Sequence, residues 1–351
     1  MYDIVGKRNL WFTISAILTI PGLIFIFLGG LKPSIDFTGG TEWEVRYADA
    51  PSAQEMTATL ADLGYDDALV TQLSDGFLRI RTEPIDLIPA ETPAPSASES
   101  AAPSASVEPS ASVEPAASGS ASPSIEPSPA PIAEGTEFAD LEDELEGIFG
   151  PGDPQSLRTV GPIIGADLIR SSAILIVIGE LFILGYLWMR FGFRFGTAAI
   201  VALLHDVILV VGTFAILGYF FNVEFDALFV TALLTIIGFS VHDTIVVFDR
   251  IRENRIRHVG ESFGAIVNHS ILQTMGRSII TSLTVVVTLG ALLLLGPPTI
   301  RTFTLALLLG VVSGTYSSIF NASQLLVAWN EWDAKRRTRD GVARPARSTA
   351  R

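Results

Sequence analysis

The stretch Ile236–Asn254 reads IIGFSVHDTIVVFDRIREN; it begins inside an apolar run and ends in alternating charges. The run itself covers about Ala227–Phe248, roughly 22 residues, which is long enough to cross a ~30 Å hydrocarbon core at ~1.5 Å per residue. His242 and Asp243 lie inside this run, among apolar residues that favour the hydrocarbon core of a membrane. An ionisable residue within a membrane span marks a functional site by default, so the stretch predicts a spanning helix with a functional carboxylate.

The rest of the chain fits a membrane protein. Mean hydropathy over the 351 residues is +0.45 and 49% of them are hydrophobic, whereas soluble domains rarely average above zero. Five further apolar segments have the length of a span, at about Leu10–Leu28, Leu168–Met189, Gly196–Phe220, Ser278–Leu295 and Phe303–Ala328. The chain has no cysteine, which excludes disulfides, thiolate metal sites and a cysteine nucleophile.

Basic residues next to the spans predict the orientation. They cluster in four places: Lys7 with Arg8; Arg190 with Arg194; Arg250, Arg252, Arg255 and Arg257; and Lys335, Arg336, Arg337 and Arg339. Six spans put these clusters on one side, which the positive-inside rule identifies as cytoplasmic. Between Thr82 and Leu157 there is no Lys or Arg but there are fifteen Asp or Glu. We therefore expect both termini in the cytoplasm and residues 29–167 outside.

Four domains follow from these boundaries: the cytoplasmic N-terminus and first span (1–28), an extracytoplasmic domain (29–167), a bundle of five helices (168–328) and a basic cytoplasmic tail (329–351). The extracytoplasmic domain shows strand patterns at Thr41–Tyr47, Ala68–Leu73, Phe77–Arg81 and Ser156–Val160, helix patterns at Ala53–Leu63 and Phe138–Phe149, and a turn at Ser74-Asp75-Gly76. This β-α-β-β-α-β order predicts a ferredoxin-like fold. It is interrupted at 93–131 by a Pro-, Ala-, Ser- and Glu-rich insert, which we expect to be disordered.

Six titratable residues lie in or at the ends of the predicted spans and are the candidates for proton coupling: Asp243, Arg277, Asp206, His205, His242 and Glu180. A carboxylate in mid-helix costs about 2.5–3.5 kcal/mol on insertion scales, and burial favours its protonated form while a nearby cation favours the ionised one. We expect the six to form one polar cluster inside the bundle, with Asp243 handling the proton. Two histidines with carboxylates also suggest a metal site, but their helical spacing is not a recognised ligand pattern.

Structural roles without proton coupling stay open for four of these residues. Arg277 can snorkel to the inner interface, and His205 and His242 can be hydrogen-bonded packing residues. Glu180 can sit protonated against a neighbouring helix.

Two neighbouring patterns predict structure rather than chemistry. Gly310 and Gly314, four residues apart, indicate a tightly packed sixth helix. In the tail FDRIREN, we expect Asp249 to pair with Arg252 and Glu253 with Arg257 along a continuing helix.

Seven motifs in their order carry a resemblance to a known family. They are IDFTGG (Ile35–Gly40), VGPIIG (Val160–Gly165), MRFGFRFG (Met189–Gly196), ALLHDV (Ala202–Val207), the stretch Ile236–Asn254, GRSIITS (Gly276–Ser282) and GTYSSIF (Gly314–Phe320). With six spans and a large domain after the first, the chain resembles the SecD/SecF family of the resistance-nodulation-division (RND) superfamily. The insert and the two termini fall outside the resemblance.

The resemblance implies an auxiliary subunit of bacterial protein export in the plasma membrane. Such a subunit would act with a SecD partner and use the proton gradient, with no other cofactor, in late translocation. Further implied contacts are the SecYEG channel, the translocating preprotein and membrane lipids, with SecA and YidC-type components indirectly and no nucleic acid. By match to the family pattern, Asp243 would be the proton-responsive carboxylate and Arg277 its basic neighbour. His242 stands where many relatives have Asn, and Glu180 matches no family motif.

Other functions remain to be weighed. An RND-type proton-driven exporter of small molecules or lipids would share the spans, and a non-energised scaffold would make Asp243 merely structural. An enzyme is disfavoured because no nucleophile–base pair, P-loop or metal motif is present. The residues leave open whether protons or sodium ions are coupled.

Overall fold

The computed structural model describes residues 3–73, 76–85 and 136–339, and the chain divides into two compact units. One unit comprises Met1–Thr38 and Ile163–Arg351, and the other comprises Gly39–Pro162. The insert predicted at 93–131, residues 74–75 of the predicted turn and the end of the predicted tail from residue 340 lie outside the described residues.

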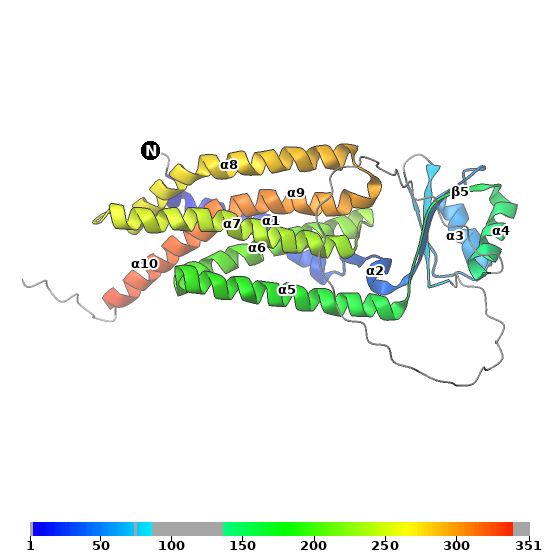
Figure 1. Cartoon of the computed structure of the whole chain (residues 1–351), viewed down its shortest axis with the longest axis horizontal. Helices are drawn as coiled ribbons and strands as arrows, with labels where there is room; N and C mark the ends of the chain where they lie inside the picture. Colours follow the sequence, from blue (N-terminus) through cyan, green and yellow to red (C-terminus); the bar gives the residue numbers. More distant parts are fainter. Residues whose placement is uncertain (1–2, 74–75, 86–135, 340–351) are drawn as a thin grey trace, which may run out of the picture. The chain divides into compact units, whose positions relative to one another are not determined.

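Six helices of the first unit are long and apolar enough to span a membrane, which confirms the six predicted spans. They are α1 (Arg8–Phe27, preceded by the 3-10 turn Val5–Lys7), α5 (Pro162–Phe191), α6 (Phe193–Phe221), α7 (Ala227–Arg257), α8 (Phe263–Leu295) and a sixth continuous helix (Figure 1). The sixth consists of α9 (Arg301–Ser317), a π-helical turn (Ser318–Ala322) and α10 (Ser323–Arg339), after a 3-10 turn at Pro298–Ile300. The chain is therefore a multi-pass membrane protein.

Helix α7 and the sixth helix form the centre of the bundle. Half of the apolar window of each is buried, compared with 6% for α5. Their close approach depends on the predicted glycines: a Cβ atom on Gly310 would lie 2.2 Å from the Ile236 side chain, and one on Gly314 would lie 3.1 Å from Ser240 Cβ. The prediction of tight packing is confirmed, and α9 touches α7 closely enough for short polar side chains to bond between them.

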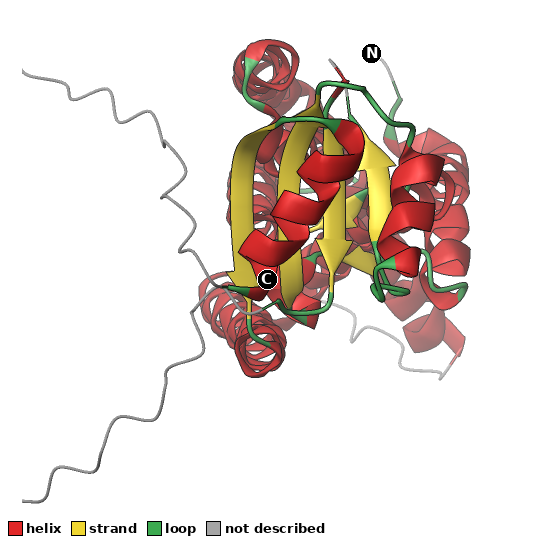
Figure 2. Cartoon of the chain, turned by 90° about the vertical axis from the view of Figure 1, so that its right-hand side faces the viewer, coloured by secondary structure: helices red, strands yellow, loops and turns green. Residues whose placement is uncertain are grey.

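The second unit is a four-stranded antiparallel sheet with the strand order β3-β4-β2-β5. Its elements are β2 (Gly40–Tyr47), α3 (Ala53–Asp62), β3 (Leu69–Gln72), β4 (Leu78–Thr82), α4 (Glu137–Phe149) and β5 (Gly152–Val160). Figure 2 shows both helices on one face of this sheet. The order and the pairing are those of the ferredoxin-like fold, as the sequence predicts.

Local signals explain these elements. Ser52 and Glu55 form a capping box at the start of α3, which satisfies backbone N–H groups that have no partner in the first turn. Alternation along β2 points Trp43 and Val45 toward the helices, where the Trp43 ring meets Phe138 edge-on at 5.3 Å. Helix α4 ends at Gly150, whose φ of 76° suits a residue without Cβ.

A short segment of the first unit ties the start of α7 to the chain that enters the sheet. Strand β1 (Lys32–Pro33) pairs in parallel with β6 (Glu224–Phe225), and α2 (Ile35–Thr38) follows directly. The Asp36 carboxylate of α2 accepts a hydrogen bond from the Ala227 backbone N–H at 3.0 Å. A carboxylate is favourable there because a helix N-terminus carries partial positive charge.

Candidate functional site

A buried carboxylate joins three helices at the centre of the bundle. Asp206 of α6 is 0% exposed and accepts hydrogen bonds from the hydroxyls of Ser240 on α7 and of Ser313 and Ser317 on α9. The O–O distances are 2.6, 2.6 and 2.5 Å respectively. His205 Nδ1 lies 3.2 Å from Oδ1 of the same carboxylate, the oxygen that also accepts from Ser313. Both oxygens of Asp206 therefore have two partners each.

A second buried carboxylate, Asp243, lies on α7, about one helical turn after Ser240. Asp243 is 8% exposed, and its Oδ1 accepts a hydrogen bond from the Ser278 hydroxyl of α8 at 2.6 Å. Its Oδ2 is buried with no hydrogen-bond partner among the described residues. An unpartnered oxygen on a buried carboxylate carries a large desolvation penalty, which protonation of that oxygen would relieve.

Hydroxyl groups connect the neighbourhoods of the two carboxylates. Thr244, next to Asp243, lies 2.9 Å from the hydroxyl of Ser318. Ser318 is the first residue of the π-helical turn and follows Ser317, the donor to Asp206. Single π turns inside α-helices occur frequently at functional sites. Here the turn lies beside both carboxylates.

The other predicted site residues do not join one cluster. His242 and Arg277 are both exposed, and among the described residues Arg277 forms no ion pair with Asp243. Glu180 on α5 is half-buried, and its side chain makes no hydrogen bond within the described part of the chain. The predicted single cluster of six is thus not formed: Asp206 meets His205, Asp243 bonds to Ser278, and the side chains of His242, Arg277 and Glu180 bond to neither carboxylate within the described residues. No group of three or more His, Asp or Glu within residues 3–73, 76–85 and 136–339 is placed to hold a metal ion.

At the end of α7 the predicted charge pairs are half right. Arg257 pairs with Glu253 at 2.7 Å, as expected. Asp249 pairs with Arg190 of α5 at 3.6 Å and not with Arg252, which donates to the Arg190 carbonyl instead. The partner from another helix prevails because the end of α5 lies beside α7 at this level, where Phe191 also packs against Phe248.

Sequence reasoning missed the residues that serve the carboxylates. Ser240, Ser313 and Ser317 all donate to Asp206, and none of them is among the six predicted candidates. A run of serines opposite a helix with an internal aspartate was the available signal. Ser278, which follows Arg277 in the motif GRSIITS, is the donor to Asp243.

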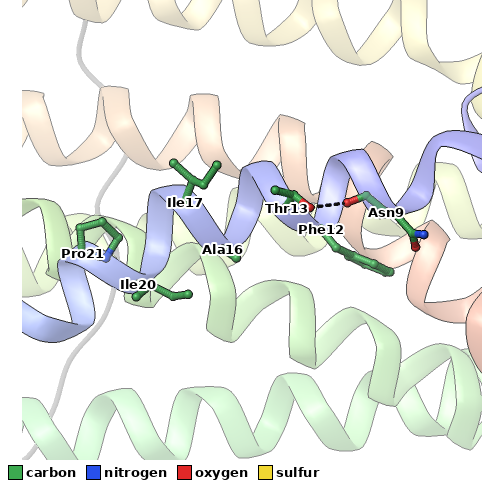
Figure 3. Close-up of a pocket in the computed structure, with 7 residues that line it drawn as sticks. All are labelled: Asn9, Phe12, Thr13, Ala16, Ile17, Ile20 and Pro21. Carbon is green, nitrogen blue, oxygen red and sulfur yellow. Dashed lines mark hydrogen bonds between the residues drawn. The ribbon is translucent and has the colours of Figure 1, made fainter.

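A separate hollow of about 670 Å³ lies along α1, away from the carboxylates. It is lined mainly by apolar side chains (Figure 3): Asn9, Phe12, Thr13, Ala16, Ile17, Ile20 and Pro21. The Thr13 hydroxyl donates to the Asn9 carbonyl of the same helix, so this polar group is satisfied locally. The hollow offers no chemistry beyond apolar contact.

Comparison with known proteins agrees with this architecture. Residues 141–332 match the family model described as protein export membrane protein SecD/SecF, C-terminal. Protein translocase subunit SecF of Thermobaculum terrenum is 43% identical over 95% of each chain, and that of Anaerolinea thermophila is 37% identical over 95% of this chain and 96% of the relative.

A solved structure shares the fold. The crystal structure of SecDF, a translocon-associated membrane protein from Thermus thermophilus, superposes with a TM-score of 0.72 at 30% identity. The match covers 94% of this chain and 39% of the SecDF chain, so this chain spans about two fifths of that longer protein. On the matched motifs, the shared fold and the identity over nearly its whole length, the chain belongs to the SecD/SecF family of protein-export membrane proteins.

Proposed function

We propose that this chain is the SecF-type auxiliary subunit of the Sec protein-export machinery, and that it couples the proton gradient to a late step in the translocation of secreted polypeptides. The full-length similarity to SecF subunits supports the export role. The observation that carries the coupling is Asp243, a buried carboxylate between α7 and α8 with one oxygen satisfied and the other without a partner. Such a group changes its hydrogen bonding when it gains or loses a proton.

The partner in this proposal is a SecD-type subunit. Relatives exist in which SecD and SecF are one chain, and the present chain accounts for 35% of one such relative from Thermus thermophilus. His242 and Arg277 are exposed beside Asp243, although they lie on helices that span the membrane. Polar and charged residues in membrane spans face protein or water in preference to lipid. We therefore assign the α7–α8 face around these residues to the SecD-type partner.

Several charged groups surround Asp243 on the elements packed against α7. His242 is its neighbour on the same helix, α8 carries Arg277 next to Ser278, and α6 carries Asp206, which accepts from Ser240. The sixth helix contributes hydroxyls at this level, including Ser318. A proton on Asp243 removes one negative charge from this set and changes which helix packing is most stable.

The change reaches the sheet unit through the start of α7. Asp36 caps α7 at Ala227, and β2 begins at Gly40, a few residues after Asp36. A shift of α7 therefore acts on the segment that enters the sheet. Moving one charge across ~100 mV supplies about 2.3 kcal/mol, which biases a two-state rearrangement without saturating it.

The remaining assignments belong to the same proposal. The protein would lie in the bacterial plasma membrane with both termini in the cytoplasm and the sheet unit outside, following the positive-inside rule. It would act with the SecYEG channel and the preprotein, with SecA and YidC-type components indirectly, and without a cofactor or enzymatic chemistry. The proton gradient is its energy source.

Asp243→Asn tests the proposal in membrane vesicles that contain the SecD partner and the channel. The variant should lose the gradient-dependent part of late export, because the amide cannot take up a proton. Asp249→Asn is the matched control, since its side chain is exposed at the end of the same helix. Gradient-driven export at full strength with Asp243→Asn would refute the coupling role. Replacing the proton gradient by a sodium gradient distinguishes the two ions.

The alternative function is a proton-driven exporter of small molecules or lipids of the same superfamily. Drug or lipid transport by the same vesicles that depends on Asp243, with polypeptide export unaffected, would favour it.

A further inference from the structure

We propose that Asp206 is a positioning residue: it stays ionised and holds α6, α7 and α9 in one rotational setting, in which α7 presents Asp243 to Ser278 of α8. The inference rests on the proposed function only for the role of Asp243. It separates Asp206 from the proton-coupling residues with which the sequence groups it.

The hydrogen bonds around Asp206 fit an ionised carboxylate. An ionised carboxylate is an acceptor only, with about four lone-pair positions. Three hydroxyls donate to Asp206, Ser240 and Ser317 to Oδ2 and Ser313 to Oδ1, and His205 Nδ1 lies 3.2 Å from Oδ1. The three hydroxyl contacts, at 2.5–2.6 Å, lie in the range of hydrogen bonds to a charged oxygen.

Protonation would disrupt this arrangement. A protonated carboxyl becomes a donor on one oxygen, so at least one of the surrounding groups would have to turn away or reverse its own hydrogen. Asp206 is fully buried, and a broken buried hydrogen bond leaves an unsatisfied polar group, which is expensive. Asp243 faces no such conflict, because its second oxygen is unpartnered and can accept a proton without displacing a donor.

The Asp206 contacts determine the rotation of α7. Ser240 precedes Asp243 by three residues, so the two side chains project from neighbouring positions about 60° apart around the helix axis. Once Ser240 is directed at Asp206 of α6, Asp243 is directed at α8, where Ser278 meets it. The glycine at 314 lets α9 approach Ser240, so Ser313 and Ser317 reach the same carboxylate.

Disulfide trapping in the full chain tests this directly, since the natural sequence contains no cysteine. The reporter pair is Asp243→Cys with Ser278→Cys, whose native side chains touch at 2.6 Å. The control pair is Asn254→Cys with Ser270→Cys, on the same two helices, where the native contact is 2.9 Å. Each pair is placed in membrane vesicles with the SecD partner, and cross-linking rates under a mild oxidant are compared with and without Asp206→Asn.

Asp206→Asn should slow the reporter pair about tenfold relative to the control pair, equivalent to ~1.4 kcal/mol in the population of the aligned state. Ser313→Ala with Ser317→Ala, which keeps the carboxylate and removes two donors, should slow it in the same direction and covers the case that Asp206→Asn does not insert. An unchanged ratio of the two rates, or equal slowing of both pairs, would overturn the positioning role. So would an Asp206→Asn protein with unchanged cross-linking and an altered pH dependence of export, because Asp206 would then be a proton carrier.

The cross-linking requires no export. A failed positioning role and a failed coupling role for Asp243 therefore give separate results.

Discussion

The two buried carboxylates of the bundle differ in their donors and not in their depth. Asp206 is 0% exposed with four partners, and Asp243 is 8% exposed with one donor and one unpartnered oxygen. Burial penalises the charged form of both, but three hydroxyls donate to Asp206 and only Ser278 donates to Asp243 among the described residues. The role of an acidic residue in a membrane span therefore depends on the hydrogen bonds it receives, since both carboxylates are buried.

The largest expected difference is in reactivity toward a hydrophobic carbodiimide, which modifies protonated carboxyl groups. Asp243 should be modified in vesicles at neutral pH, and Asp206 should stay unmodified, because its four partners favour the ionised form. Mass spectrometry of the two peptides measures both sites in one sample. Modification of Asp206 to the same extent as Asp243 would contradict the proposed difference between the two carboxyl groups.

The second largest effect is expected on stability, at the close contact between α9 and α7 beside Asp206. Gly314→Val adds a side chain whose Cβ would lie 3.1 Å from Ser240 Cβ, and overpacking of this kind costs about 3 kcal/mol. Gly290→Val on α8 is the control, because nothing lies within 4 Å of its Cβ position. Thermal unfolding in detergent should separate the two variants. Equal stability would show that α9 can move away from α7 freely.

The third effect is the loss of stability when a single hydrogen-bond donor is removed from either carboxylate. Ser317→Ala should destabilise the bundle by about 2 kcal/mol, because it takes a donor from a carboxylate whose four positions are filled. Ser278→Ala should cost less, since protonation of Asp243 can absorb the loss. Unfolding temperatures of the two variants, measured at the same pH, check the order. A larger loss for Ser278→Ala would reverse the assignment of the two carboxylates.

The smallest effect concerns a half-buried carboxyl of the sheet unit. Burial, with Glu146 and Asp143 nearby, raises the pKa of Glu142 above its usual range. The folded state therefore binds this proton more tightly than the unfolded state, so the stability it contributes is full below the ordinary value of about 4.3 and is lost as pH rises through the raised pKa. Glu142→Gln should slightly raise the unfolding temperature at about pH 7 and have little effect near pH 4.

Fluorescence of Trp43, in a background where the other four of the five tryptophans are replaced by Phe, reports on this unit. A stabilisation by Glu142→Gln that is the same at both pH values would show that the carboxyl is not disfavoured by its surroundings.

Much of the fold was predictable because its signals are local. Apolar length identifies the spans, as for Ala227–Phe248 within α7, and alternation identifies β2 and β4 of the sheet. Gly310 and Gly314 indicated the tight contact of the sixth helix for the same reason: spacing on one helix face needs no knowledge of the partner. The prediction that Asp249 pairs with Arg252 was wrong because Arg190, on another helix, competes with the arginine three residues away.

Six membrane spans, a ferredoxin-like unit and the positions of Asp206 and Asp243 within spans are all predictable from the sequence, because hydropathy and periodicity are properties of contiguous residues. Only the tertiary structure decided which carboxylate receives which donors. Ser313 and Ser317 lie more than a hundred residues from Asp206, and they reach it because interhelical rotation and the close approach at Gly314 bring them there. Hydrogen bonds between helices depend on these global packing angles, which no local pattern encodes.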